Sequence, residues 1–324
     1  MSKNDKKREI DYRIDFVIDR KVLNKKTKEF SFHIVPDSRR YKWEKKDGKK
    51  YLYDTKDNLL IPEKVVEDMM KQSVGKPIYH QPSIISDVNS YFKNRVDFVE
   101  RGLRGDIIEC EKSDVSGNFL DNIDKENLGF VIMCVDMVGS TKLANNLESI
   151  KYTRLITTLL NELSEITFGF RGHILKYTGD GILAYFSEPS LLSKNDLSLD
   201  CAMIMTLFIE KLFNPICVKY QYPEINIRIG IDTGQAAVVV IGSPSTKRQS
   251  DIIGKVVNIA SKIQSIGKPG NILVGEATNR IIHTMWREGL EKIPIPNNWP
   301  YMNDDGKPYG VYKLRDGFVP KITP

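Results

Sequence analysis

The segment FVIMCVDMVGST, residues 130–141, gives the strongest indication of the fold of this chain of 324 residues. Its apolar run has the length of a buried strand and ends at Asp136, which is followed by glycine and small hydroxyl residues. A second run, ILKYTGDGILAYF, residues 174–186, breaks at Asp180 between two glycines and predicts a hairpin. Each aspartate alone is also typical of a turn cap. Two carboxylates at neighbouring strand ends, however, favour a site for a divalent cation and phosphate groups.

The composition is that of an ordinary globular protein, with 41% hydrophobic residues, 28% charged residues and a net charge of +6. Basic clusters at residues 3–8 and 39–46 suit nucleic acid or anionic lipid, but a solvated surface explains them as well. The sequence contains neither a helix-turn-helix nor a base-stacking motif, so we expect no nucleic-acid partner.

The sequence gives no indication of export or of membrane insertion. The N-terminus is charged from Lys3 to Glu9, and the most apolar stretch, residues 201–209, is far shorter than the roughly 20 residues that span a bilayer. We therefore expect a cytoplasmic protein without a membrane partner, in which residues 201–209 form a buried helix. No disulfide or metal-ligand spacing relates the four cysteines, Cys110, Cys134, Cys201 and Cys217.

The predicted domains are an N-terminal regulatory or dimerisation module at 1–105, a linker at 106–127, a catalytic domain at 128–285 and a C-terminal extension at 286–324. We expect the N-terminal module to be a small mixed α/β arrangement, with strands at 11–18 and 30–35, a hairpin at 42–53 and a helix at 63–70. Apolar residues at helical spacing over 83–103 predict a helix with one apolar face. That face either packs on its own domain or serves a dimer contact or signal transmission.

From residue 128 the pattern predicts an α+β fold, a ferredoxin-like and mainly antiparallel sheet with helices packed on one face. The expected strands are 128–137, the hairpin 171–187, a hairpin 226–241 that turns at Thr233-Gly234, 271–274 and 309–314. The expected helices are 140–169, 197–213, the later part of 251–264, which begins as a loop, and 276–285.

A third motif, DIIGKVVNIASK, residues 251–262, brings a carboxylate, an amide and a cation together around a turn that leads into a helix. Asn258 and Lys262 are four residues apart and therefore share one helix face. This arrangement suits contact with the sugar and the phosphates of a nucleotide.

Taken in order, these segments resemble the catalytic domain of the class III nucleotidyl cyclases, the adenylate and guanylate cyclases, over residues 128–285. The resemblance implies two-metal conversion of a nucleoside triphosphate into a 3′,5′-cyclic nucleotide and pyrophosphate. It also implies a homodimer with its sites between protomers. The metal aspartates of each site would come from one chain, and Lys176, Asp251, Asn258 and Lys262 from the other. An effector that reads the cyclic nucleotide would be a further partner.

The resemblance implies a role for each matching residue. The metal site would hold two Mg²⁺ or Mn²⁺ ions on Asp136, Asp180 and the carbonyl of Met137. Phosphate oxygens would meet the backbone N–H groups of Val138, Gly139, Ser140 and Thr141. Asn258 would hold the ribose, and Lys262 would meet charge on the α-phosphate in the transition state. Most active members have arginine where this chain has Lys262, which keeps the charge but loses the bidentate fork and so slows the reaction.

Lys176 and Asp251 match the positions that contact the base in adenylate-type members. The lysine would donate to adenine N1 and the aspartate would accept from the exocyclic amine, so ATP is the favoured substrate. The alternative is that Lys176 is a surface lysine and Asp251 a loop residue.

Two alternative functions stay open at this point. Pyrimidine cyclases of the antiphage Pycsar type share this catalytic core, and the basic loop 243–250, with Lys247 or Arg248, suits a reshaped base pocket. The substrate would then be UTP or CTP. In the other alternative the domain is catalytically degenerate and binds nucleotide in order to regulate a partner.

Overall fold

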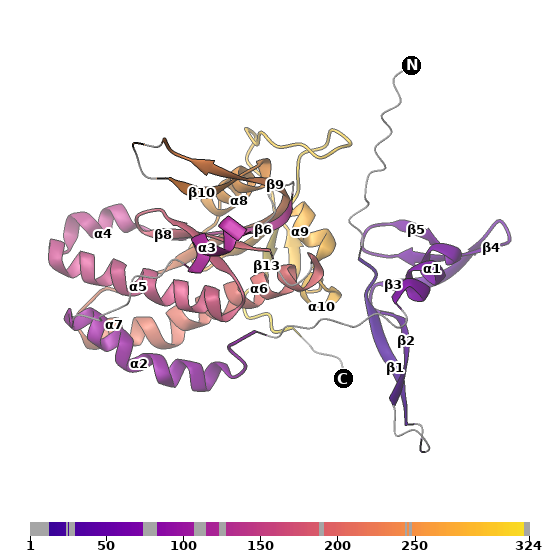
Figure 1. Cartoon of the computed structure of the whole chain (residues 1–324), viewed down its shortest axis with the longest axis horizontal. Coiled ribbons are helices and arrows are strands. Elements are labelled where there is room, and N and C mark those ends of the chain that lie inside the picture. Colours follow the sequence, from indigo (N-terminus) through magenta and orange to yellow (C-terminus); the bar gives the residue numbers. More distant parts are fainter. Residues whose placement is uncertain are drawn as a thin grey trace. The chain divides into compact units, whose positions relative to one another are not determined.

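The computed structural model (Figure 1) describes residues 13–23, 25, 30–73, 83–106, 115–122, 128–187, 191–243, 245 and 248–320. Residues 3–8, Cys110, Lys247 and most of the predicted linker lie outside this description. The chain forms two compact units. Unit 1 combines Met1–Tyr79 with Arg280–Gly289 and Val319–Pro324, and unit 2 combines His80–Asn279 with Leu290–Phe318.

Unit 2 is built on one mainly antiparallel sheet with the strand order β12-β13-β11-β9-β6-β8-β7, in which β10 also pairs with β9 and β11 runs parallel to β9. The predicted fold class, an antiparallel sheet with helices packed on it, is confirmed. The strands are β6 (Leu128–Met137), β7 (His173–Tyr177), β8 (Gly181–Phe186), β9 (Ile227–Ile241), β10 (Gln249–Ile253), β11 (Ile272–Gly275), β12 (Leu290–Lys292) and β13 (Val311–Leu314).

Helices cover both faces of this sheet, whereas the sequence predicted them on one face. The even-numbered residues of β6 from Phe130 to Cys134 share an apolar cluster with α8 (Lys255–Ser265) and α3 (Val115–Asn122). The odd-numbered residues from Val131 to Val135 are also buried and, because side chains alternate along a strand, face the other way. Against the sheet, α5 (Ser149–Gly169) packs on β7 and β8, and α6 (Leu191–Phe208) packs on β6, β8 and β9 (Figure 1).

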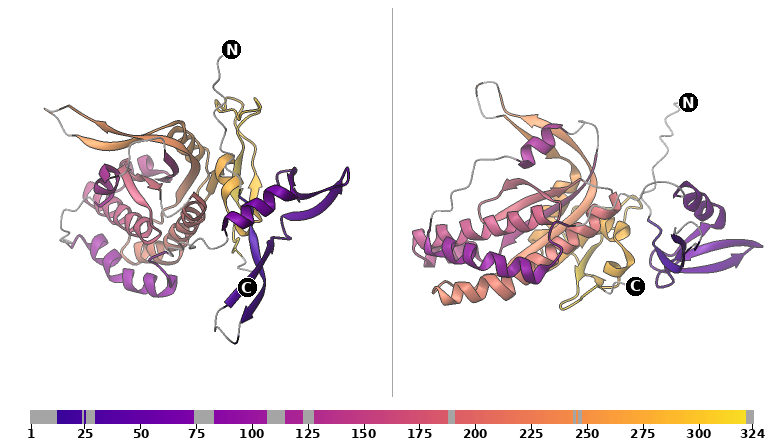
Figure 2. Two further views of the ribbon diagram at one scale, coloured as in Figure 1. Left: turned by 45° about the vertical axis from the view of Figure 1, so that its right-hand side comes forward. Right: turned by 60° about the horizontal axis from the view of Figure 1, so that its bottom comes forward.

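The hairpin predicted at Thr233-Gly234 does not form. β9 continues through both residues and pairs with β6 over the whole of Leu128–Met137. Gly234 is instead a place of close approach, because a Cβ there would lie 3.1 Å from the side chain of Val256 on α8. The chain reverses after Ile241, and β9 and β10 form an arm that extends away from the sheet (Figure 2). The predicted loop at the start of 251–264 is therefore the end of β10.

The predicted helix 140–169 is interrupted and forms α4 (Ser140–Asn146) and α5. The predicted helix 83–103 forms as α2 (Val88–Arg104) and packs on α5, where the Arg95 guanidinium donates to both oxygens of Glu162 at 2.6 and 2.8 Å. This helix therefore packs within unit 2 and not within the N-terminal module.

The predicted helix 197–213 is part of a longer one. α6 continues into the π-helical turn η1 (Ile209–Phe213) and then into α7 (Asn214–Lys219). By length and composition the stretch Ser193–Lys219 is long and apolar enough to cross a membrane, and 56% of its most apolar window is buried inside the structure. Cys201, Met205 and Phe208 are fully buried, which is typical of a core helix.

Unit 1 contains two small antiparallel sheets and a helix. β1 (Phe16–Leu23) pairs with β2 (Phe30–Pro36), and β3 (Tyr41–Lys46), β4 (Lys49–Asp54) and β5 (Leu59–Pro62) form the second sheet, which is followed by α1 (Glu63–Ser73). The hairpin predicted at 42–53 forms, with Asp47 and Gly48 at φ 50° and 70° in the two-residue turn. The first strand runs later than the predicted 11–18, because Ile14 enters the apolar cluster and Asp15 enters a buried polar network.

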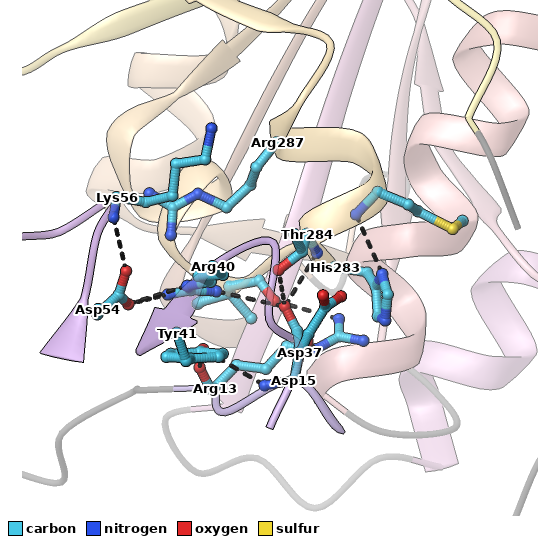
Figure 3. A network of polar contacts seen from close by, with 12 residues as sticks. Arg13, Asp15, Asp37, Arg40, Tyr41, Asp54, Lys56, His283, Thr284 and Arg287 are labelled. Atoms are coloured by element: carbon cyan, nitrogen blue, oxygen red, sulfur yellow. Dashed lines mark hydrogen bonds and ion pairs between the residues drawn. The ribbon is translucent and has the colours of Figure 1, made fainter. Parts of the chain in front are cut away.

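That polar network is centred on Arg40 (Figure 3). The guanidinium of Arg40 is fully buried and donates to Asp54 at 2.9 Å, to Asp57 at 3.0 Å and to Asp15 at 3.4 Å. A buried charge is costly unless it is paired, so these contacts hold together the strands and turns that carry them.

The same network binds a segment from far along the chain. Oδ2 of Asp15 accepts hydrogen bonds from the backbone N–H and the hydroxyl of Thr284 at 2.9 and 2.5 Å (Figure 3). Arg287 donates to both oxygens of Asp57 at 2.8 and 3.0 Å. The helix predicted at 276–285 is therefore divided into α9 (Glu276–Ile281) and α10 (Thr284–Arg287), and α10 folds with the N-terminal residues of unit 1.

Candidate active site

The two predicted metal aspartates lie at adjoining ends of β6 and β8. Asp136 is directly opposite Gly181 in the antiparallel pair, so Asp180 comes one residue before that register position. Gly181 permits the close approach, because a Cβ there would lie 2.2 Å from the carbonyl oxygen of Val135. Burial raises the pKa of Tyr152 in the first turn of α5, and the negative charge of Asp180 raises it further.

Two residues that the sequence motifs did not indicate hold Asp136 in place. Arg228 stands opposite Asp136 on β9 and donates to Oδ2 from Nε at 3.1 Å and from Nη2 at 2.8 Å. Gln264 on α8 donates to the same oxygen at 3.1 Å. The sequence held a signal for Arg228, since an arginine within an otherwise apolar strand is a candidate partner for a carboxylate on a neighbouring strand.

The donor set at Asp136 and Asp180 fits a divalent cation. Within the described residues, every hydrogen bond to Asp136 reaches Oδ2, which leaves Oδ1 for a cation. The described residues contain no group of three or more His, Cys, Asp or Glu side chains that forms a metal site by itself. Mg²⁺ needs no such group, because it is usually bound through one or two carboxylates together with substrate phosphates. The carbonyl of Met137, at the end of β6, is a further oxygen ligand of the right kind.

The turn after β6 offers fewer phosphate donors than predicted. The N–H of Val138 donates to the carbonyl of Asn226 at 2.8 Å, which extends the β6–β9 pairing by one residue and removes Val138 from the predicted donors. Gly139 precedes α4, and in the described chain no side chain caps this helix. Ser140 and Thr141 therefore stand at a helix start, where the first N–H groups have no acceptor inside the helix.

The two predicted base-contacting residues meet each other. Nζ of Lys176 on β7 donates to Oδ2 of Asp251 on β10 at 2.8 Å. The Asp251 side chain is 11% exposed, and its Oδ1 accepts the backbone N–H of Ile252 at 2.8 Å. Asp251 is thus a strand residue with a fixed orientation, and Lys176 is paired rather than free on the surface. In the basic loop 243–250, which directly precedes Asp251, the Arg248 side chain is exposed.

Asn258 and Lys262 both lie on the exposed side of α8. The other side of the helix buries Val256, Ala260 and Ile263. Among the described residues, neither side chain forms a hydrogen bond or ion pair with the two metal aspartates or with the Lys176–Asp251 pair. Within one chain, the structure therefore brings together two pairs of predicted site residues but not the complete set.

A buried carboxyl also stands on β9, at Asp232. It is 1% exposed, and its Oδ1 accepts the hydroxyl of Tyr309 at 2.8 Å. Burial raises the pKa of Asp232 from the ordinary 3.8 to about 7, although the bonds from Tyr309 and from the Thr233 N–H and the charge of Lys255 act in the opposite direction. This carboxyl therefore changes its charge near neutral pH.

Comparison with known sequences gives consistent matches. Residues 125–294 match the family model of the adenylate and guanylate cyclase catalytic domain. The chain is 26% identical to a cytidylate cyclase of Escherichia coli, over 61% of this chain and 40% of the relative. It is 29% identical to an adenylate cyclase of Anabaena cylindrica, over 46% of this chain and 30% of the relative. The chain thus spans less than half the length of these curated relatives.

Solved structures agree with this fold. The guanylyl cyclase Cya2 matches with a TM-score of 0.51 at 20% identity, over 59% of this chain and 94% of that chain. The adenylyl cyclase CyaB from P. aeruginosa also matches with a TM-score of 0.51, at 23% identity, over 61% of this chain and 100% of that chain. The family model covers more than half of the sequence and includes all the predicted site residues. This chain therefore belongs to the family of adenylate and guanylate cyclase catalytic domains.

Proposed function

We propose that this protein is a nucleotidyl cyclase that converts a nucleoside triphosphate into a 3′,5′-cyclic nucleotide and pyrophosphate. The observation that carries the proposal is the register of Asp136 opposite Gly181, which places Asp136 and Asp180 at adjoining strand ends in a member of a cyclase family. The presence of both metal aspartates together with Asn258 argues against a domain that only binds nucleotide. The degenerate alternative is therefore the less favoured one.

The metal-binding half of the site would act on the ribose and the phosphates. Asp136, Asp180 and the Met137 carbonyl would hold two divalent cations, Mg²⁺ or Mn²⁺, which supply Lewis-acid activation of the 3′-hydroxyl and neutralise charge on the phosphates. The N–H groups of Ser140 and Thr141 at the start of α4 would bind phosphate oxygens.

The residues of α8 would act on the ribose and on the α-phosphate. Asn258 would orient the sugar, and Lys262 would stabilise negative charge that grows on the α-phosphate in the transition state. An ammonium group cannot form the two parallel bonds of a guanidinium group. We therefore expect a slower reaction than with arginine at this position.

A complete site would require a second copy of this chain. Asn258 and Lys262 face outward on α8, as expected for residues that serve a partner's nucleotide. The arm formed by β9 and β10 exposes apolar surface at Val240, Ile241 and Ile253, which are 41%, 44% and 56% exposed. We infer a homodimer whose two sites each combine residues from both protomers, with side chains of the arm as part of the contact surface.

The pair Lys176 and Asp251 supports a substrate whose base carries an exocyclic amine. Adenine offers an acceptor at N1 beside the amine donor at N6, and cytosine offers the same pattern at N3 and N4. Guanine and uracil present the reverse pattern, in which the protein's donor would face a donor. ATP is therefore the first candidate and CTP the second.

The second candidate has independent support from the relatives. Two of them, from Escherichia coli and Staphylococcus aureus, are named cytidylate cyclases, and one from Burkholderia cepacia is named a uridylate cyclase. A pyrimidine product would fit a second messenger of antiphage defence that is read by a downstream effector. UTP is the less favoured pyrimidine, because the carbonyl at its position 4 cannot donate to Asp251.

A product assay tests the proposal directly. The purified protein is incubated with Mn²⁺ and with ATP, CTP, GTP or UTP in separate reactions, and the products are identified by mass. We expect cyclic AMP or cyclic CMP, and activity should be lost in Asp136→Ala. Cyclic GMP or cyclic UMP as the main product would refute the base assignment. The absence of any cyclic nucleotide would refute the enzyme itself.

Complementation tests the shared site. Asp136→Ala and Asn258→Ala should each abolish activity alone, because each variant damages both sites of its homodimer. Mixing the two variants should restore activity of up to about half per heterodimer, since one of its two sites then contains only native residues. If heterodimers form, as shown by co-purification of two different tags, and activity stays absent, the site does not lie between protomers.

A further inference from the structure

α3 (Val115–Asn122) lies before the part of the chain that matches the cyclase family model, which begins at residue 125. It packs on β7 and β10, the two strands that carry Lys176 and Asp251. A short helix outside the family's own segment thus contacts both strands of the base-contacting pair.

Backbone pairing does not fix the distance between β7 and β10. β7 pairs with β8, and β10 pairs with β9, and among the described strands no backbone ladder joins β7 to β10. The ion pair of Lys176 and Asp251 does join the two strands, but it is partly exposed, because the lysine side chain is 41% exposed. An exposed ion pair contributes little to holding two strands together.

On the β7 side, α3 is fixed by its first turn and by an aromatic stack. Oγ of Ser116 accepts the backbone N–H of Ile174 at 3.1 Å, and its carbonyl accepts the hydroxyl of Tyr185 at 2.9 Å. The ring of Phe119 stacks on His173, with centroids 4.2 Å apart and an angle of 19° between the planes. Ile174 and His173 lie within three residues of Lys176 on β7, and Tyr185 lies on the neighbouring strand β8.

On the β10 side, the end of α3 is joined to the residue that precedes Asp251. The hydroxyl of Ser250 donates to Oδ1 of Asp121. Leu120 is 2% exposed and shares an apolar cluster with Ile252, which follows Asp251. Asp251 is therefore flanked on both sides by residues that α3 contacts.

We propose that α3 sets the distance between Lys176 and Asp251 and thereby determines base selectivity. The inference rests on the proposed function, because it concerns recognition of an amine-bearing base by that pair. Ser116 and Asp121 are positioning residues in this account. They act on the nucleotide only through Lys176 and Asp251, so their loss affects binding of the preferred base and not the chemistry at the phosphate.

The test compares Asp121→Ala with Asp121→Asn, which keeps an oxygen acceptor for Ser250. For Asp121→Ala we expect KM for the preferred nucleotide to rise about 3- to 10-fold, as for the loss of one hydrogen bond, with kcat within about twofold. KM for the disfavoured nucleotides should stay unchanged, so selectivity falls by the same factor. Asp121→Asn should recover most of the lost selectivity. Asp97→Ala on α2, which removes a side chain that is 72% exposed and 3.9 Å from Arg101, is the control and should change nothing.

A second measurement does not depend on turnover. Binding of the α,β-methylene analogue of the preferred nucleotide should weaken about 3- to 10-fold in Asp121→Ala, and should change no further when Asp121→Ala is added to Lys176→Ala. An equal loss for all four nucleotides together with a lower Tm would show that α3 only stabilises the fold, which overturns the inference. If the native protein makes no cyclic nucleotide, the proposed function fails instead, and the binding measurement still decides the role of α3.

Discussion

Replacing Asp232 by asparagine should make the protein more stable at neutral pH, and by an amount that depends on pH. Asparagine keeps an oxygen that accepts the Tyr309 hydroxyl, so the main change is the loss of a titrating group. In the folded protein burial raises the pKa of Asp232 from 3.8 to about 7. Between these two values the folded state retains a proton that the unfolded state has released.

The sign and size of the pH effect on the free energy of unfolding follow from this difference in pKa. Where the folded state binds more protons than the unfolded state, stability falls as the pH rises, here from about pH 4 until the folded pKa is passed. One pKa unit corresponds to about 1.4 kcal/mol, so the total is about 4 kcal/mol, of which about 3 kcal/mol falls between pH 5 and pH 8. Asp232→Asn lacks this loss, and its free energy of unfolding should equal that of the native protein near pH 4.

The measurement is the free energy of unfolding from urea titrations, followed by circular dichroism, at several pH values between 5 and 8. Burial and the charge of Asp196 also raise the pKa of Asp200 to about 7, so the native profile contains a second contribution that cancels when variant and native protein are subtracted. Asp305→Asn, at an exposed ion pair 3.5 Å from Lys307, is the control and should follow the native profile. An Asp232→Asn profile parallel to the native one would refute the argument, because Asp232 would then not carry the proton.

Two further predictions concern the ion pairs of the structure. Arg40→Ala leaves buried carboxylates unpaired and should destabilise unit 1 by about 3–5 kcal/mol. The measurement is hydrogen exchange, which should become faster in β3, β4 and β5. Unchanged exchange in these strands would contradict a structural role for Arg40. Arg228→Gln removes a positive charge 2.8 Å from Asp136 and should tighten binding of Mn²⁺ in the absence of nucleotide by about fivefold, measured by electron paramagnetic resonance of free Mn²⁺. Weaker Mn²⁺ binding would show that orientation of Asp136 by Arg228 matters more than its charge.

Several elements were predictable because their signals are local. The strand at 128–137 and the hairpin at 171–187 were confirmed within two or three residues, since an apolar run bounded by glycines specifies a buried strand without outside help. Thr233-Gly234 shows where local signals fail. The pair is typical of a turn, but pairing with β6 along the whole strand and the contact with α8 keep it extended.

Sequence motifs were enough to predict an antiparallel cyclase-type sheet, with Asp136 and Asp180 at adjoining strand ends and with Lys176 and Asp251 as a second pair. The residues that hold these groups in place became visible only in the folded chain. Arg228 reaches Asp136 across 92 residues of sequence, and Thr284 reaches Asp15 across 269. A charge that distant segments withdraw partly or fully from water is paired with whichever residues folding brings near, and no periodicity along the chain records which residues those are.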